Sequence, residues 1–250
     1  MPRYKLTIEY DGTPYAGWQR QPRQLTVQAV LEKAINRFCG AETRLITAGR
    51  TDAGVHAFAQ IAHVDFEKTW QVDTVSNALN AYLLQAGERV SILHTEEVTH
   101  SFHARFSAIR RHYLYRILNR RAPPTLDARY VWWIPRVLDI EKMQKAACHL
   151  IGRHDFTTFR AVQCQAKSAI RTLDQLNIRI NGQWVEILAS AQSFLHHQIR
   201  SIAGSLAAVG WGDWTVDDLE AALEARDRAR CAVVAPARGL YLVRVDYACK

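Results

Sequence analysis

The chain has 250 residues, of which 48% are hydrophobic and 22% are charged, and its net charge is +8. This composition is ordinary for a soluble globular protein, and no apolar run approaches the ~20 residues that a membrane-spanning helix requires. Because the first residues also lack the apolar core of a signal peptide, we expect a cytoplasmic protein without membrane contact.

The first hundred residues alternate between strand and helix patterns. Alternating β-forming residues predict a strand over Tyr4–Tyr10, and helical spacing predicts a helix that is capped by Thr26 and stopped by Gly40. Further segments are a strand at Thr43–Thr47, a strand at Phe58–Phe66, a helix at Val72–Leu84 and a strand within Glu88–Val98. For His63 and Asp65 a metal pair is conceivable, but outward-facing strand positions are favoured.

The second half repeats this alternation. A strand is expected over Ser107–Leu118, and Asp139 caps a helix that ends at Gly152. Asn181-Gly182 is a strong hairpin signal between two further strands. The remaining elements are those hairpin strands at Ser168–Ile180 and Trp184–Ala191, a helix at His196–Val209 that ends at Gly210, a helix capped by Thr215 with Asp218, and a strand at Gly239–Tyr247.

The positive charge is concentrated in the second half. Residues 1–104 contain 10 Lys and Arg against 11 Asp and Glu, whereas residues 105–250 contain 22 against 13, and the excess is nearly all arginine. Arginine suits phosphate recognition, so this distribution favours nucleic-acid binding over a merely solvated surface. The five cysteines are scattered without a C-x-x-C pair, which argues against a disulfide framework or a zinc site.

The string AGRTDAGVHA, residues 48–57, has Arg50 and Asp52 as its only formal charges, set among small residues. Glycine on both sides of the aspartate permits close approach of a ligand to the backbone. A lone carboxylate in such a loop has three roles open to it: nucleophile, general base or structural cap. From the residue types alone, the structural role is favoured.

The same string meets every defined position of G-R-T-D-x-G-V-H-A, the signature of the tRNA pseudouridine synthase A family. Other segments resemble family motifs in the same order: YDGTPYAGWQRQP at 10–22 with TVQ at 26–28, ARFSAIRRHYLYRI at 104–117, GRHDFTTFRA at 152–161 with Cys164 and RTL at 171–173, FLHHQIRSIAGSLAAVG at 194–210, and APARGLYLVRVDY at 235–247. Together they cover most of the chain. We therefore identify a resemblance to this family.

Element order and resemblance together imply an α+β fold with two similar ferredoxin-like, or RRM-like, halves. The antiparallel sheets of the halves are expected to join into one large mixed sheet, with helices on one face and a central RNA-binding cleft. We expect the N-terminal half, 1–104, to carry the catalytic Asp loop. The C-terminal, arginine-rich half, 105–250, is expected to carry a base-stacking tyrosine and an arginine partner.

The resemblance implies an isomerase that converts uridine to pseudouridine at positions 38, 39 and 40 of the tRNA anticodon stem-loop. It also implies a homodimer bound to tRNA, with no cofactor and no metal. The base must leave its stack before an enzyme can reach its sugar. Asp52 corresponds to the essential carboxylate; whether it attacks a carbon covalently or first removes a ribose proton stays open.

Other residues acquire roles through the same resemblance. Tyr113 would stack on the target uracil, and a further role as proton acceptor at carbon 5 stays open. Arg200 would form an ion pair that keeps Asp52 charged and oriented. Arg50 would fill the vacated stack or hold a phosphate. The remaining substrate-binding candidates are Thr51, His56, Arg111, and Leu240 or Leu242 as an apolar wall.

The chain departs from the family pattern at His196-His197-Gln198-Ile199, where the family has x-x-M-V. The polar Gln198 beside Arg200 leaves the packing of that helix open. Three rival functions remain: an inactive RNA-binding or chaperone module, a synthase with another RNA target or tRNA position, and a carboxylate-based hydrolase that releases free uracil. The intact Arg50-Thr51-Asp52 set argues against the first, and the lack of a second well-placed acid argues against the hydrolase.

Overall fold

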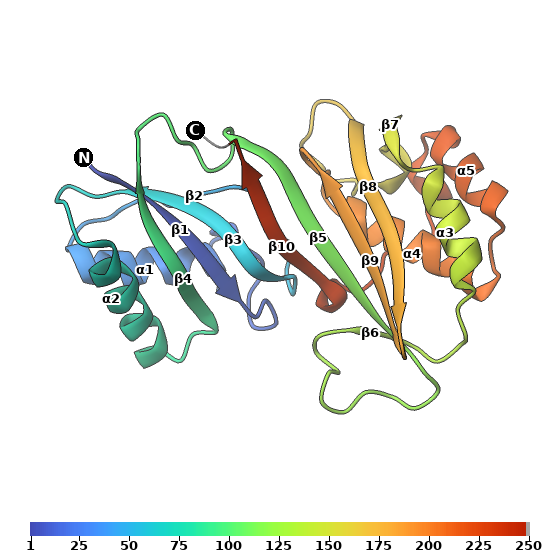
Figure 1. Ribbon diagram of the computed structural model, residues 1–250, viewed down its shortest axis with the longest axis horizontal. Helices are drawn as coiled ribbons and strands as arrows, with labels where there is room; N and C mark the ends of the chain where they lie inside the picture. Colours follow the sequence, from blue (N-terminus) through green and yellow to red (C-terminus); the bar gives the residue numbers. More distant parts are fainter. Residues whose placement is uncertain (249–250) are drawn as a thin grey trace. The chain divides into compact units, whose positions relative to one another are not determined.

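A computed structural model describes residues 1–248 and divides into two compact units (Figure 1). Unit 1 comprises Met1–Ile109 together with residues 241–248, and unit 2 comprises Arg110–Leu240. The expected halves, 1–104 and 105–250, overlap these units for most of their length. The final strand differs, because it pairs with a strand of unit 1.

Unit 1 is built on the strands β1 (Arg3–Tyr10), β3 (His56–Asp65), β4 (Val90–Val98) and β10 (Leu240–Tyr247), with the short β2 (Ile46–Thr47). β1 is central and runs antiparallel to both β3 and β4. β10 runs parallel to β3, with Tyr241 opposite His56 and Leu242 opposite Ala57. This parallel pair places the last strand beside the start of β3.

Two helices complete unit 1: α1 (Val27–Cys39) and α2 (Val72–Gln85). The hydroxyl of Thr26 accepts from the Ala29 N–H, and Gly40 ends α1 at φ +73°, so both expected caps are confirmed. α2 is fixed to β4 through Asn80, whose side chain donates to the carbonyl of Ile92 and accepts from its N–H. Of these contacts, the two caps of α1 were predicted from the sequence.

Unit 2 contains the strands β5 (Ala108–Asn119), β9 (Trp184–Ala191), β8 (Ile170–Asn181) and β7 (Gly152–Asp155), paired antiparallel in that order. β6 (Trp132–Ile134) lies parallel to β5. The hairpin between β8 and β9 turns at Gly182, at φ +60°, as expected. β6 and β7 were not predicted, because three or four residues carry too little alternation to mark a strand.

The helices of unit 2 are α3 (Ile140–Cys148), α4 (Gln198–Trp211) and α5 (Val216–Ala225). Short 3-10 turns lie at Thr157–Phe159, Arg228–Arg230 and Ala237–Gly239. Asp139 caps α3, and Thr215 with Asp218 forms the expected capping box of α5. α3 and α4 pack against each other, and α4 is buried along most of its length.

The prediction that α4 ends at Gly210 is wrong. An ideal Cβ at Gly210 would lie 2.6 Å from the Met143 sulfur, so this glycine allows close packing of α4 on α3. The helix ends at Gly212, whose φ is +85°. The predicted start at His196 is also wrong, because His197 adopts φ +64° and the helix begins at Gln198.

Two expectations for unit 1 also change. The expected strand Thr43–Thr47 is reduced to Ile46–Thr47. His63 does not face outward; it is buried, and its Nδ1 accepts from the Ala104 N–H at 3.1 Å. The predicted α+β class, with helices and mainly antiparallel strands in both parts, is confirmed. Over residues 1–248, none of the helices has the length and apolar character needed to cross a bilayer.

Candidate active site

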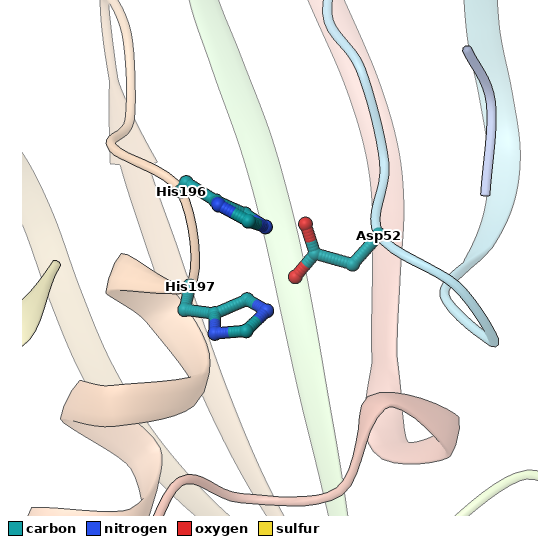
Figure 2. A group of neighbouring side chains, drawn as sticks. All are labelled: Asp52, His196 and His197. Carbon is teal, nitrogen blue, oxygen red and sulfur yellow. The ribbon is translucent and has the colours of Figure 1, made fainter. Parts of the chain in front are cut away.

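Asp52 lies on the loop between β2 and β3 in unit 1, and its side chain is half-buried (Figure 2). The Asp52 carbonyl accepts from the Val55 N–H at 3.1 Å, and Gly54 adopts φ +76°. The chain therefore turns immediately after the carboxylate. Only small side chains, Ala53 and Gly54, occupy this turn.

Two glycines from the 11–17 segment let the backbone approach the Asp52 loop. An ideal Cβ on Gly12 would lie 2.0 Å from the Val55 carbonyl oxygen, and one on Gly17 would lie 2.7 Å from the Thr51 carbonyl oxygen. That same Thr51 carbonyl accepts from the Trp18 N–H at 3.0 Å. The loop is thus held by main-chain contacts that a larger side chain would exclude.

Thr51 is buried, with 7% of its surface exposed, and its hydroxyl lies 2.8 Å from the Tyr10 hydroxyl. Gln60 of β3 donates to the Gly49 carbonyl at 2.8 Å. Burial raises the pKa of Tyr10 to about 12, so its hydroxyl keeps its proton at neutral pH. Thr51, which was expected to bind substrate, is therefore a buried residue that supports the Asp52 loop through its contact with Tyr10.

Arg50 and His56 occupy opposite environments. Arg50 is exposed, and its guanidinium has no hydrogen bond or ion pair with the described part of the chain. His56 is buried at the start of β3, where its ring stacks on Tyr241 at 4.8 Å. Arg50 is the substrate-binding candidate that solvent can reach.

The Nδ1 atom of His56 links β3 to the loop that follows β1. It accepts from the Gly12 N–H at 3.1 Å, which corresponds to a neutral ring protonated on Nε2. The same Nδ1 lies 3.2 Å from Asp11 Oδ1, a contact that becomes an ion pair only when the ring is protonated. Arg89 neutralises Asp11 from the other side at 2.6 Å. His56 therefore fixes the position of Gly12.

In unit 2, β5 carries Arg111 and Tyr113, both with 8% of their surface exposed. The Tyr113 ring meets Phe194 edge to face, with centroids 5.2 Å apart. Arg111 donates from Nη1 to the Gln192 carbonyl at 2.5 Å. Two residues of β5 thus contact the segment between β9 and α4. Phe194 was quoted in the resemblance but not recognised as a partner of Tyr113.

Arg200 lies in the first turn of α4 and donates from Nε to the Ala235 carbonyl at 2.8 Å. The Gln198 side chain accepts from the Leu195 N–H at 2.8 Å and is buried. This hydrogen bond explains how a polar residue is accommodated where the family has methionine. His196 and His197 precede the helix, with ring centroids 4.2 Å apart (Figure 2).

The two leucines that were candidates for an apolar wall are buried. Leu242 is fully buried on β10 opposite Ala57, and Leu240 is 6% exposed. Within unit 1 the structure brings Arg50, Thr51, Asp52 and His56 onto one loop and the adjoining start of β3. Within unit 2 it brings Arg111 and Tyr113 together with the segment before α4.

Comparison with known proteins decides the family. A sequence model described as tRNA pseudouridine synthase matches residues 6–107 and 146–248, which make up most of the chain. The chain belongs to the tRNA pseudouridine synthase family. The matched ranges contain Asp52 and Arg200, whereas Tyr113 lies between them. Members of this family are isomerases that convert uridine to pseudouridine, so the predicted enzyme class is confirmed.

Individual relatives agree with this family. A protein of Bartonella bacilliformis called tRNA pseudouridine synthase A is 60% identical over 247 residues, covering 99% of this chain and 100% of the relative. One of Brucella ovis with the same name is 60% identical over 248 residues, covering 99% of each chain. Among solved structures, the chain is similar to one in a Cbf5-Nop10-Gar1 complex, at 12% identity and a TM-score of 0.37. That alignment covers 96% of this chain and 48% of the other.

Proposed function

We propose that this chain converts uridine to pseudouridine in the anticodon stem-loop of tRNA, at positions 38, 39 and 40, with Asp52 as the catalytic carboxylate. The observation that carries the proposal is the Asp52 loop. It holds a half-buried carboxylate among small residues, on a backbone fixed by Gly12 and Gly17, in a member of this family. The name tRNA pseudouridine synthase A, borne by relatives 60% identical, supports tRNA as the substrate.

The reaction exchanges two bonds at the same ribose carbon. The bond from C1′ to N1 of uracil breaks, the base turns, and C1′ bonds to C5. The hydrogen on C5 leaves as a proton and N1 gains one, so the balance needs no oxidant, reductant or second substrate. Asp52 acts either by adding to a carbon of the intermediate or by taking a ribose proton, and both routes require an ionised carboxylate.

Supporting roles extend the proposal. Tyr113, with Phe194 at its edge, offers a ring on which the target uracil stacks. The exposed Arg50, two residues from Asp52, fills the position that the extruded base leaves. For Arg200, the role of ion-pair partner of Asp52 rests on the family resemblance. The same resemblance supports a cytoplasmic homodimer that needs neither cofactor nor metal.

The decisive experiment measures tritium release from anticodon stem-loop RNA labelled at C5 of uracil. Isomerisation expels this hydrogen, so the wild-type protein should release tritium without releasing free uracil. Asp52→Ala and Asp52→Asn should release none while still binding the RNA. Asp217→Asn, an exposed acid at the start of α5, removes the same charge elsewhere and should match the wild type.

The rival functions give different results in this assay. Tight RNA binding without tritium release by the wild type would mean a binding module. Free uracil as product would mean a hydrolase. Release only from RNA that carries uridine outside positions 38 to 40 would mean a synthase of different target position. Stem-loops with a single labelled uridine at each position separate this last case.

A further inference from the structure

Unit 2 contains a small polar cavity at the open end of the β8–β9 hairpin, away from the turn at Gly182. Its volume is about 250 Å³, and its lining residues are Arg153, Ile170, Arg171, Thr172, Gln192 and Ser193. The β8–β9 ladder ends at the Leu173–Ala191 pair, and the cavity lies beyond it. It therefore forms where the strands no longer pair, between β7, β8 and the segment that follows β9.

The two arginines of this cavity have no carboxylate partner in the described chain. The Arg153 side chain makes no hydrogen bond or ion pair there. Arg171 donates from Nη1 to two carbonyls, those of Ser168 and Ile170, and its buried Nε has no partner. Burial lowers the pKa of Arg171, so a bound anion would relieve the cost of holding this charge.

Nearby acids are already engaged elsewhere. Asp174, on β8, pairs with Arg110 at 3.0 Å. Asp155, on β7, accepts from the N–H and hydroxyl of Thr157 at 2.9 and 2.6 Å. The lining residues thus include two arginines, the hydroxyl residues Thr172 and Ser193, and Gln192, with no carboxylate among them.

A second hollow, in unit 1, is different. Its volume is about 970 Å³, it lies along α1 in unit 1, and it is lined by both signs of charge, with Glu32 and Glu42 beside Arg20, Lys33 and Arg44. Glu32 already lies 3.6 Å from Arg20. The smaller cavity has no carboxylate among its lining residues and combines two arginines with two hydroxyl residues, which suits a phosphate group.

We propose that this cavity binds a backbone phosphate of the RNA, next to the nucleotide whose base stacks on Tyr113. The cavity wall leads directly to that tyrosine: the Gln192 carbonyl accepts from Arg111, and Phe194, next to Ser193, contacts the Tyr113 ring. A phosphate held here would fix the sugar of the extruded nucleotide relative to its base. This inference rests on the proposed function, because it takes RNA as the substrate.

The test measures RNA binding by fluorescence anisotropy as salt is varied. Arg153→Gln is the main variant, because the Arg153 side chain is exposed and makes no hydrogen bond, so the substitution should leave folding intact. Arg179→Gln is the matched control, since Arg179 is also exposed and unpaired on β8 but does not line the cavity. Arg171→Lys is a second variant that keeps the charge but loses the forked geometry, with its folding checked by thermal melting.

For a phosphate contact we expect Arg153→Gln to weaken binding about 3- to 10-fold and to reduce the slope of log K against log salt by ~1. Arg179→Gln should stay within about twofold of the wild type. Replacing one phosphate beside the target nucleotide by an uncharged methylphosphonate should weaken wild-type binding by the same factor. The same replacement should weaken binding to Arg153→Gln no further.

Three outcomes overturn the proposal. Equal losses for Arg153→Gln and Arg179→Gln would mean diffuse attraction without a site. Methylphosphonate losses that add fully to that of Arg153→Gln would mean that the cavity does not hold that phosphate. A response of the Thr172 and Ser193 amide resonances to inorganic phosphate, without methylphosphonate coupling, would mean a site for a free anion. Tritium release, measured on the same samples, reports separately on the proposed function.

Discussion

Strands β3 of unit 1 and β9 of unit 2 use their buried positions in opposite ways. β3 buries three polar side chains, and each holds a different loop: His56 accepts from Gly12, Gln60 donates to Gly49, and His63 accepts from Ala104. β9 buries four apolar residues and one small polar residue, Ser190, and the polar groups beyond its end line a cavity; the apolar residues are Val185, Ile187, Ala189 and Ala191. The first arrangement positions backbone, whereas the second leaves side chains available to a ligand.

The hydrogen-bond partner of each polar group determines how that group affects the free energy of folding. A buried polar group costs free energy unless it is hydrogen-bonded, so the three β3 side chains favour one placement of each loop. The Asp52 loop gains a fixed backbone position in this way. The cavity of unit 2 keeps donors without protein partners, which is useful only where a ligand supplies the acceptors.

The largest expected effect is that of Gly12→Ala, which breaks the positioning of the Asp52 loop. Its Cβ would lie 2.0 Å from the Val55 carbonyl oxygen, so the backbone must move. We expect a loss of about 3 kcal/mol in the free energy of unfolding, measured by urea denaturation, and a large loss of pseudouridine formation. Gly87→Ala, at φ +69° with open space around it, should cost only ~1 kcal/mol. Equal costs would show that the close approach is unimportant.

The next largest effect is a pH dependence of the free energy of unfolding, which arises from the buried His63 of β3. Burial, with smaller contributions from Arg3 and His103, lowers the pKa of His63 to about 4. Between pH 6.5 and 4 the unfolded chain therefore binds a proton that the folded chain does not, and stability falls as the pH falls. We expect a loss on the order of 2 kcal/mol between pH 7 and 4.5.

His63→Gln tests this origin, because its amide oxygen can still accept from Ala104 without titrating. Its free energy of unfolding should vary less with pH over the same range. Asp65, whose pKa is lowered mainly by its hydrogen bond from Arg3, loses its contribution below this range. Parallel pH profiles for wild type and His63→Gln would assign the pH dependence to other groups.

A smaller effect is expected at the Tyr10–Thr51 contact beneath the Asp52 loop. Tyr10→Phe leaves the buried Thr51 hydroxyl without this partner and should cost ~1–2 kcal/mol. The double variant with Thr51→Val should cost less than the two single variants combined, because both partners are then absent. A double-mutant cycle by urea denaturation measures this coupling, and exact additivity would contradict it.

The smallest effect should come from Thr215→Ala in unit 2. It removes the capping box of α5, where Thr215 and Asp218 exchange hydrogen bonds at the surface. We expect a cost of ~1 kcal/mol in thermal unfolding and unchanged tritium release. A loss of activity without a loss of stability would show that the contrast between the two strands misses a functional surface at α5.

Local features were predictable from the sequence, whereas features that depend on distant partners were not. The caps at Thr26 and Gly40 and the box at Thr215 and Asp218 follow from neighbouring residues alone. The burial of His63 depends on Ala104, 41 residues away, and the helix-packing role of Gly210 depends on Met143. Periodicity carries no information about such partners.

The candidate site also contains both a local feature, which was predictable, and features that depend on distant partners, which were not. The Asp52 loop was recognisable because its whole string matches one signature. Its supports were not assigned, because Tyr10, Gly12, Gly17 and Gln60 come from separate parts of the chain. Likewise, the arginine excess predicted a nucleic-acid surface, but which arginines line a cavity depends on where β8 and β9 stop pairing.

The parallel pairing of β10 with β3 sets an order of events during protein synthesis. Residues 110–240, which form unit 2, must all be translated before Tyr241 can stack on His56. At ~5–20 residues per second this interval is roughly 7 to 25 s. Throughout it, the edge of β3 next to the Asp52 loop lacks its β10 neighbour. The nascent chain therefore completes the sheet beside its Asp52 loop only after the whole of its second unit has been synthesised.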